Sequence, residues 1–571
     1  MVDGPELIWP GKYDADGTRV PTPRPGAVLE AVERIGRHAD ADRLLHGDNL
    51  EALDALQSSH RGGIDLIYID PPFATGGRFS VQTRVGLGEK RKAAPEISAP
   101  AYTDRFEGGA TGFLQMLAPR LQLMHDLLAP HGSLYLHVDP TVGHMAKLLL
   151  DEVFGPGCFQ REIVWRIGWI SGFKSKAKNW IRNHDLIFFY VKDPQNFTFN
   201  KKYVPYPEGY VRRDGKPPTG RGVPIDDVWN ANESEFALRG PDSLDSIQIK
   251  SFSGEKCGYA TQKNESLARR IIEASSNPGD VVADFFCGSG TVGVAARRLG
   301  RRFVGSDCSS AAVHIAKKRL IEVGGEAAPA LSVERVTVPT AARREAYKPR
   351  VCAHLGIALE PAGPFAGRSD AAAVYVADMD EAVDAALIER LAAQCPDDIT
   401  ALEVVGRRFD LALPWTPPEG VDVTLLRVGE DLWNDAVAAV PGAALCEVPD
   451  VEVDVVESDD GFALALRRYR FAHPERLDER LRAAATDPLD LVDAWSVTWR
   501  PVPLLALQTD AVHQRTHQRR ALPDQTAPHP VPDKPQRAML KIVDVLYQST
   551  TLVCDYEPRG GRVVLTGVRL R

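Results

Sequence analysis

Two short apolar runs in the first third of the chain end abruptly at an aspartate followed by proline. Ile64–Ile69 leads into Asp70-Pro71-Pro72, and Ser133–Val138 leads into Asp139-Pro140. Between them, Phe113 to Leu128 carries Leu and Met at helical spacing. Short β-branched runs of this kind are typical of buried parallel strands. The pattern therefore predicts a strand, helix, strand unit of a parallel sheet.

A second unit of the same kind follows far downstream. Val281 to Phe286 reads as a strand, a glycine-rich turn leads into a helix over Val292 to Leu299, and Arg302 to Ser306 reads as a strand that ends at Asp307. Ser309 is placed to cap a further helix. Because more than a hundred residues separate the two units, we expect two halves of one sheet with an insertion between them.

The expected insertion, roughly Gln160 to Gly254, is aromatic and basic. The whole chain has 571 residues and a net charge of −9, which gives no reason to expect a polyanionic partner. From Arg161 to Arg221, however, thirteen Lys and Arg stand against five Asp and Glu, a local charge of +8. A basic, aromatic stretch is typical of nucleic-acid contact. A solvated loop region with a small aromatic core is the alternative.

The remaining segments complete the expected domain plan. Phe79 to Asp104 is expected to be a long loop, and its place directly after a strand end suggests a lid. Beyond a linker, Cys352 to Val448 reads as a small α/β domain. Several strand-like runs follow and predict a β-rich C-terminal domain, with Ala521 to Gln536 as a flexible proline-rich loop.

Composition excludes several classes of protein. The eight cysteines are scattered singly, which argues against a disulfide scaffold and a zinc site, so no metal is expected. We find no signal peptide, no apolar run long enough to span a bilayer and no ATPase phosphate loop. We therefore expect a soluble, cytoplasmic protein without a membrane partner.

Two of the strand ends carry chemistry. The turn from Phe286 to Thr291 (FCGSGT) lets a ligand approach the backbone, and the acid that ends the next strand, Asp307, suits a ribose. Asp70-Pro71-Pro72-Phe73 forms a rigid, acceptor-rich corner beside an aromatic ring, which suits an exocyclic amine. A tight turn with Phe73 in the core is the alternative.

Four motifs together resemble a known family. DPPF (Asp70 to Phe73), YATQKNESLARRIIEASSNPGD (Tyr259 to Asp280), ADFFCGSGT (Ala283 to Thr291) and GSDCSSAAVHIAKKRL (Gly305 to Leu320) resemble amino-directed DNA methyltransferases. Their order is similar to the β-class, in particular to type III modification subunits. The resemblance covers residues 40 to 325. It implies a Rossmann-like α/β methyltransferase sheet that binds S-adenosylmethionine.

The resemblance also assigns the site residues. Asp70, Pro71, Pro72 and Phe73 would be catalytic, with the Asp70 carboxylate and the Pro71 carbonyl accepting from the amine and Phe73 stacking on a flipped base. The cofactor would contact Asp48, Thr261, Gln262, Lys263, Asp284, Phe286, Gly288, Gly290, Thr291, Asp307 and Cys308. Tyr259-Ala260 and Phe285 depart from the family's usual His-Pro and Pro, which bears on rate or affinity.

The implied domains are a catalytic half (1–159), an inserted target-recognition region (160–254), a cofactor-binding half (255–335), a small α/β domain (350–448) and a β-rich C-terminal domain (449–571). Within the insertion, DNA contacts are expected from Lys174, Lys176, Lys178 and Arg182.

The implied activity is methylation of adenine N6 in double-stranded DNA, as the modification arm of a restriction or phage-defence system. A separate nuclease or helicase subunit and a homodimer are expected partners. Methylation of cytosine N4, methylation of RNA or of a protein amide, and a catalytically idle DNA-recognition subunit are the alternatives.

Overall fold

The structure is a computed structural model of the full chain. It describes residues 5–571, apart from 39, 86–94, 167–177, 207–208, 231–234, 236–237, 239–242, 245–252, 325–328, 339–340, 361–362, 370–371, 397, 434–443, 474–475, 488, 500–506 and 517–520.

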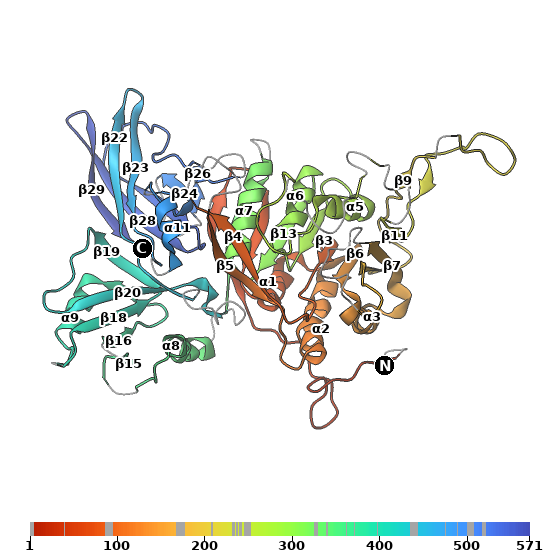
Figure 1. The fold of residues 1–571 in the computed structure, drawn as a ribbon, viewed down its shortest axis with the longest axis horizontal. Helices are drawn as coiled ribbons and strands as arrows, with labels where there is room; N and C mark the ends of the chain where they lie inside the picture. Colours follow the sequence, from red (N-terminus) through yellow and green to blue (C-terminus); the bar gives the residue numbers. More distant parts are fainter. Residues whose placement is uncertain are drawn as a thin grey trace.

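An eleven-stranded mixed sheet forms the centre of the molecule (Figure 1). In spatial order its strands are β11 (Val228–Trp229), β7 (Phe159–Arg166), β8 (His184–Val191), β6 (Leu128–Val138), β3 (Ile64–Ile69), β12 (Val281–Asp284), β13 (Arg302–Asp307), β2 (Ala41–His46), β14 (Ala330–Thr337), β1 (Val28–Ile35) and β25 (Leu507–Thr509). The six strands from β6 to β14 are parallel to one another. The two sequence-predicted units therefore meet at β3 and β12, as the Rossmann-like prediction requires.

Helices cover both faces of this sheet. One face packs against α1 (Asn49–His60), α2 (Ala110–Leu127) and α3 (Pro140–Phe154), and the other packs against α5 (Glu265–Ser275), α6 (Thr291–Arg298) and α7 (Ser310–Gly324). Neighbouring strand residues alternate between the two cores: Leu66 contacts the second set of helices and Ile67 the first. Burial on both faces explains why these strands are continuously apolar in the sequence.

The segment expected to be a long loop forms a hairpin instead. Strands β4 (Arg78–Arg84) and β5 (Glu96–Thr103) pair antiparallel. Val81 and Ile97 are buried in a core that they share with the C-terminal part of the chain, and the Thr83 and Tyr547 hydroxyls lie 2.6 Å apart. Apolar residues alternate with polar ones along both strands, and the apolar side chains provide the packing. The many polar residues in this segment explain why the sequence pattern suggested a loop.

The basic insertion begins inside the sheet. Strands β7, β8 and β11 extend the central sheet beyond β6, so a boundary at residue 160 divides β7. A short 3₁₀ turn, η1 (Pro156–Cys158), precedes them, and β9 (Tyr203–Val204) pairs with β10 (Val223–Pro224) further out. The strands carry large apolar side chains because both of their faces are covered; Trp165 and Tyr190 are fully buried.

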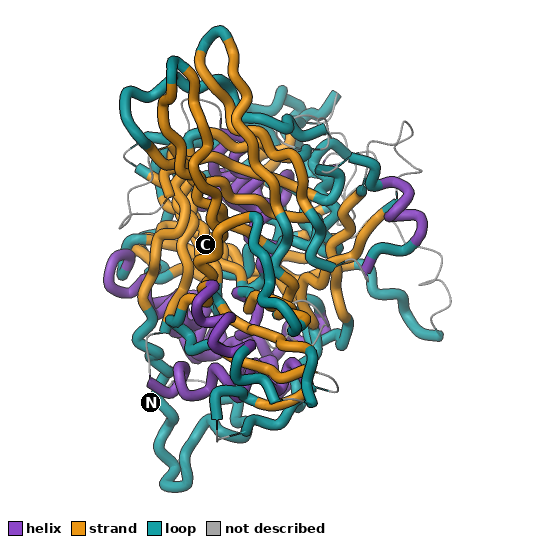
Figure 2. Tube along the Cα trace, turned by 90° about the vertical axis from the view of Figure 1, so that its left-hand side faces the viewer, coloured by secondary structure: helices purple, strands orange, loops and turns teal. Residues whose placement is uncertain are grey.

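Two further sheets build the C-terminal part, which faces the viewer in Figure 2 and consists mainly of strands. The five-stranded sheet has the order β15 (Gly367–Arg368), β16 (Ala372–Val376), β18 (Ala401–Gly406), β20 (Asp422–Val428) and β21 (Leu445–Glu447). The seven-stranded sheet has the order β17 (Ala382–Asp384), β19 (Arg408–Leu413), β29 (Arg562–Leu570), β28 (Ser549–Arg559), β27 (Gln536–Asp544), β24 (Val492–Trp499) and β26 (Ala511–Gln514). The other elements are the β22 (Val451–Ser458) and β23 (Gly461–Tyr469) hairpin, α8 (Ala341–Leu355), α9 (Ala385–Ala392), α11 (Glu479–Ala484) and η4 (Glu430–Trp433). Strands β17 and β19 belong to the second sheet, so the expected boundary at residue 448 does not separate two independent sheets.

The proline-rich segment expected to be a flexible loop lies along β23. The backbone of His529 exchanges two hydrogen bonds with Phe462, of 2.7 and 2.9 Å, and Thr526 donates to Leu464 at 2.9 Å. Proline has no backbone N–H group, but the residues between the prolines keep theirs and use them to bond to β23. Over the described residues, the helices are all too short or too polar to cross a bilayer.

Buried ion pairs attach the C-terminal part to the central sheet. Glu33 of β1 is fully buried and bonds to Lys317 of α7 at 3.2 Å and to Lys541 of β27 at 2.9 Å. Asp493 of β24 bonds to Lys318 at 2.7 Å, also on α7. Because removing one partner of such a pair leaves an uncompensated buried charge, these contacts fix the two parts relative to each other.

Candidate active site

Three carboxylates meet at the carboxyl edge of the parallel strands. Asp70 follows β3, Asp284 ends β12 and Asp307 ends β13, and these three strands are neighbours. Burial raises the pKa of Asp284 well above its usual range, and the nearby charges of Asp70 and Asp307 raise it further. Within the described residues no group of His, Cys, Asp and Glu could hold a metal ion. The carboxylates of Asp284 and Asp307 therefore favour a ligand that carries positive charge.

Asp70 presents one bound and one unbound oxygen. Its Oδ2 atom lies 2.8 Å from Lys263 Nζ. Its Oδ1 atom is buried and has no hydrogen-bond partner among the described residues. A buried acceptor without a donor is costly, because the carboxylate has lost water without replacing it. Oδ1 is thus placed to accept from a ligand N–H.

A histidine lies beside Asp70 but does not donate a hydrogen bond to Oδ1. His137 Nδ1 lies 3.9 Å from Asp70 Oδ1, which is beyond hydrogen-bonding distance. The same nitrogen lies 2.8 Å from the Tyr68 hydroxyl, and His137 Nε2 lies 3.3 Å from Asp185. With the ring hydrogen on Nε2, donated to Asp185, Nδ1 serves as the acceptor for Tyr68. This network holds the histidine ring while leaving Asp70 Oδ1 free.

The loop after Phe73 is held in a strained conformation. Ala74 has φ +59°, in the left-handed region that a residue with a Cβ rarely adopts. The buried Asp104, which follows β5, accepts from the Ala74 and Thr75 backbone N–H groups at 2.6 and 3.0 Å. Asp104 thereby fixes the direction in which the chain leaves Phe73, whose half-buried ring has Lys263 Nζ 5.3 Å from its centre.

The glycine turn depends on two positive φ values. Gly288 has φ +47°, and a Cβ there would lie 3.3 Å from the Tyr259 ring. Gly290 has φ +75°, and a Cβ there would lie 2.7 Å from Ala316 Cβ on α7. Glycine is needed at both positions for conformation and for close packing. The turn thus brings the backbone at the start of α6 up to the carboxyl edge.

Asp307 organises this turn. Its two oxygens accept from the Gly288 N–H at 2.8 Å and the Ser309 N–H at 3.0 Å. Burial raises its pKa, although those two N–H groups oppose the rise. Burial also raises the pKa of the adjacent Cys308 thiol, which argues against a reactive thiolate.

Asp48 lies one strand further, after β2. It caps α1 through the Leu50 N–H at 2.7 Å and pairs with Arg120 at 2.9 Å, while its side chain remains about half exposed. Asn49 donates to the Phe285 carbonyl at 2.8 Å, which ties this strand end to the glycine turn. Phe286 is half-buried beside them.

The segment from Thr261 to Lys263 bridges the two halves of the site. Lys263 reaches Asp70 with its side chain, and its carbonyl accepts from the Thr291 hydroxyl at 3.2 Å. Thr261 accepts from the Tyr102 hydroxyl at 3.2 Å. The Gln262 amide is bound within its own loop, to Glu255 and Cys257. Of the three residues, Lys263 has the direct link to Asp70.

The expected DNA contacts are only partly within the described residues. Lys174 and Lys176 lie outside them. Lys178 is exposed, and Trp180 close to it is 99% exposed. Arg182 pairs with Asp139 and Asp185, so its guanidinium also holds the network around His137.

Sequence reasoning missed several residues of the site. His137, Asp185 and Asp104 act from strands or strand ends, and Arg319 of α7 donates to the Ser289 carbonyl in the glycine turn at 2.8 Å. A signal existed only for His137, which directly precedes the Val138-Asp139-Pro140 strand end. The others are brought to the site by pairings distant in the sequence.

Comparison with known proteins finds similar sequences and structures over about half of the chain. The family model described as DNA methylase matches residues 64–318. The chain is 39% identical over 278 residues to "Type II methyltransferase M2.DpnII" of Streptococcus pneumoniae, covering 48% of this chain and 88% of that protein. It is 28% identical over 282 residues to "DNA adenine methyltransferase YhdJ" of Escherichia coli (strain K12), covering 49% of this chain and 83% of that protein. Among solved structures, the "M1.HpyAVI-SAM complex" is 19% identical, with a TM-score of 0.30, and the match covers 49% of this chain and 98% of that one.

The extent of these matches defines the class of the protein. This chain belongs to the DNA methylase family, and its central sheet with the Asp70 motif and the glycine turn is the DNA methyltransferase part. The family match ends at residue 318, so the whole of the C-terminal part described above lies beyond it.

Proposed function

We propose that the protein transfers a methyl group from S-adenosylmethionine to the N6 amine of adenine in double-stranded DNA. The unpartnered Asp70 Oδ1 carries the proposal, because it is a buried acceptor that needs a donor. An exocyclic amine is planar and donates two hydrogens. A relative named as an adenine methyltransferase supports adenine, and we place cytosine N4 second.

The residues at the carboxyl edge fit the cofactor. The carboxylates of Asp284 and Asp307 favour a cation, and the glycine turn leaves the space that a Cβ would fill. When bound, S-adenosylmethionine supplies an electrophilic methyl group on a positively charged sulfur. Asp307 and the backbone of the turn would hold its ribose, Asp48 would lie toward its adenine, and Phe286, Gly288, Gly290 and Thr291 would form the wall.

The protein's own residues would act by positioning. Asp70 Oδ1 accepts a hydrogen bond from the amine, with the Pro71 carbonyl as the second acceptor, and so favours a pyramidal nitrogen with a localised lone pair. Lys263 holds Oδ2 and fixes the carboxylate orientation. The proton that the amine loses passes to Asp70 Oδ1. Alignment and charge placement then supply most of the rate enhancement.

The target base must leave the duplex to reach Asp70, and Phe73 would stack on it. The insertion lies at the opposite end of the central sheet from the C-terminal part (Figure 1). Its exposed Lys178 and Trp180, with Lys174 and Lys176, are proposed to contact DNA. We further propose a type III-like modification role in the cytoplasm, as a homodimer, with a separate nuclease or helicase subunit.

Transfer of radiolabelled methyl groups tests the function. The full chain, with labelled S-adenosylmethionine, should label duplex DNA but neither RNA nor protein. Asp70→Ala should abolish labelling while cofactor binding persists. Binding of DNA without any labelling would identify the idle DNA-recognition subunit instead, and labelling of RNA alone would redirect the substrate assignment.

A further inference from the structure

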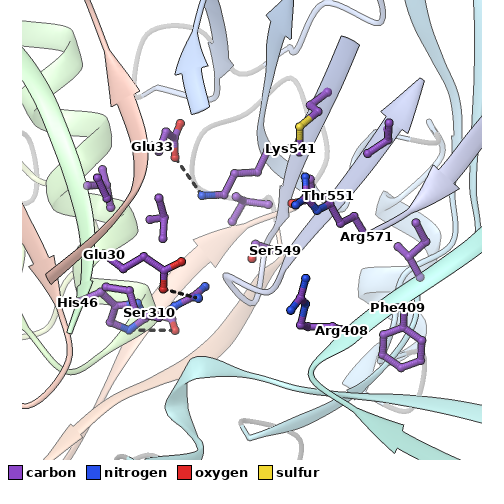
Figure 3. Close-up of a pocket in the computed structure, with 18 of the residues that line it drawn as sticks. Glu30, Glu33, His46, Ser310, Arg408, Phe409, Lys541, Ser549, Thr551 and Arg571 are labelled. Atoms are coloured by element: carbon purple, nitrogen blue, oxygen red, sulfur yellow. Dashed lines mark hydrogen bonds and ion pairs between the residues drawn. The ribbon is translucent and has the colours of Figure 1, made fainter. Parts of the chain in front are cut away.

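A cavity of about 880 Å³ separates the central sheet from the C-terminal part (Figure 3). Its size lies within the range of small-molecule sites. Asp70, Phe73 and Lys263 do not line it. His46 and Ser310 form one part of the lining, and each lies within a few residues of Asp48 or Asp307. The cavity is therefore a second space beside the cofactor-binding edge.

One wall is a single face of the seven-stranded sheet. Alternate residues line it along two strands, namely Arg537, Met539, Lys541 and Val543 of β27, and Ser549, Thr551 and Val553 of β28. Arg408, Phe409 and Asp410 of β19, with Arg569, Leu570 and Arg571 at the end of β29, complete the wall. The residues between them, such as Leu540 and Leu552, are buried in the core on the other face. Because strand side chains alternate, the sequence directs cationic and hydroxyl groups to the cavity.

The charge of the lining is positive. Seven Lys and Arg side chains (Lys317, Arg335, Arg408, Arg537, Lys541, Arg569 and Arg571) face three carboxylates (Glu30, Glu33 and Asp410), a formal balance of +4. Glu33 pairs with both lysines and offsets one of their two charges, and Glu30 lies 3.6 Å from Arg335. Arg537 and Arg569 pair with Asp555 at 2.7 and 3.1 Å.

Two arginines remain without a side-chain partner among the described residues. Arg408 and Arg571 are exposed and form no ion pair or side-chain hydrogen bond there. Arg408 lies on β19, and Arg571 directly follows β29, the strand that pairs with β19 with Leu411 opposite Leu570. In Figure 3 the labelled Arg408 points into the cavity, and Ser549 and Thr551 lie close by on β28. Guanidinium groups that line one cavity with hydroxyl groups match the oxygens of phosphate.

We propose that this cavity binds a phosphate-bearing anion through Arg408 and Arg571. The phosphate belongs either to the backbone of the bound DNA or to a free nucleotide-sized polyphosphate. Binding of a DNA backbone phosphate rests on the proposed function, whereas binding of a free polyphosphate does not. Either ligand would occupy the junction of the catalytic sheet and the C-terminal part, beside the start of α7.

Two probes and one pair of variants test the proposal. Calorimetry with inorganic pyrophosphate and with a short duplex would compare the wild type with the double variant Arg408→Ala/Arg571→Ala. The matched control is Arg480→Ala/Arg562→Ala, which removes two exposed arginines that do not line the cavity and changes the net charge equally. Thermal melting would confirm that each variant is folded.

The outcomes separate the sources. A loss of about tenfold in pyrophosphate affinity in the cavity variant alone identifies a free anion site. A fall of about 2 in the slope of log affinity for duplex against log salt identifies the DNA backbone, because each lost phosphate contact lowers it by about 0.9. Unchanged behaviour with both probes, or equal losses in the control, overturns the proposal. Methyl transfer at saturating DNA should persist in the cavity variant. Failure of the anion-site proposal can therefore be told apart from failure of the proposed methyltransferase function, which would abolish methyl transfer in the wild type as well.

Discussion

Asp70→Asn isolates the role of the unpartnered oxygen. Lys263 Nζ donates to Oδ2 at 2.8 Å, so the carbonyl oxygen of an asparagine must turn toward the lysine. The amide NH₂ then takes the place of Oδ1 and points a donor at the donating amine of the base. The variant keeps the size of the side chain and reverses its hydrogen-bonding character at the one atom that matters.

The expected loss follows from comparable transition-state contacts. Removing one positioned hydrogen-bonding group from an active site costs about 3 to 4 kcal/mol, which corresponds to a fall of roughly 100- to 1,000-fold in kcat. The S-adenosylmethionine Kd should change by less than about threefold, because the glycine turn and Asp307 do not contact Oδ1.

Single-turnover methyl transfer, with cofactor binding measured separately, checks this. Asp126→Asn is the matched control, since Asp126 pairs with Arg24 at 3.1 Å on the surface of α2. A kcat within about threefold of the wild type would refute the acceptor role. A large loss of cofactor affinity would instead show that Asp70 belongs to the cofactor site.

Three further changes probe the supporting structure. Asp104→Ala should lower kcat about tenfold with little change in cofactor affinity, because the backbone N–H groups of Ala74 and Thr75 lose their acceptors. Asp104→Asn should restore part of the rate. An equal loss in both variants would contradict this positioning role. Gly290→Ala should lower the free energy of unfolding by about 2 to 4 kcal/mol, because the alanine is strained in the left-handed region and clashes with Ala316. Gly300→Ala is the control, since Gly300 has φ +72° but open space around it, and it should cost about 1 kcal/mol. Equal losses of stability in thermal melts would exclude the clash. Burial raises the pKa of Asp544 from 3.8 to about 7, so the folded state keeps a proton that the unfolded state loses, and stability falls as pH rises from about 4 to about 7. Asp544→Asn should not show this fall, so its melting-temperature advantage over the wild type should grow up to about pH 7 and then stay constant. Between about pH 4 and pH 7 the free energy of unfolding of the wild type should fall by about 4 kcal/mol relative to the variant. A difference that does not depend on pH would contradict the raised pKa.

The parallel core could be predicted because its signals are local. Ile64–Ile69 is bounded as predicted, and Asp307 ends its strand as expected, since a buried parallel strand must be apolar until it reaches the edge. The helix predicted to continue to Leu128 ends at Leu127, where β6 begins directly. The proximity of Asp70 and Asp307 follows from one rule, that parallel strands end at one edge.

The remainder depends on contacts between distant residues. Nothing local shows that Asp104 will hold the loop after Phe73, or that β19 will join a sheet with β29. Packing between parts of the chain decides these pairings. The same reason hides the basic cavity, whose cations alternate along strands that are far apart in the sequence.

The most direct test of the central assignment is the identity of the methylated nucleoside. Duplex DNA treated with the full chain and S-adenosylmethionine would be digested to nucleosides and resolved by mass spectrometry. We expect N6-methyldeoxyadenosine, and we expect it to be absent from reactions with Asp70→Ala. N4-methyldeoxycytidine would overturn the assignment of adenine, and the absence of any methylated nucleoside would contradict the proposal that this sheet edge is a working methyltransferase site.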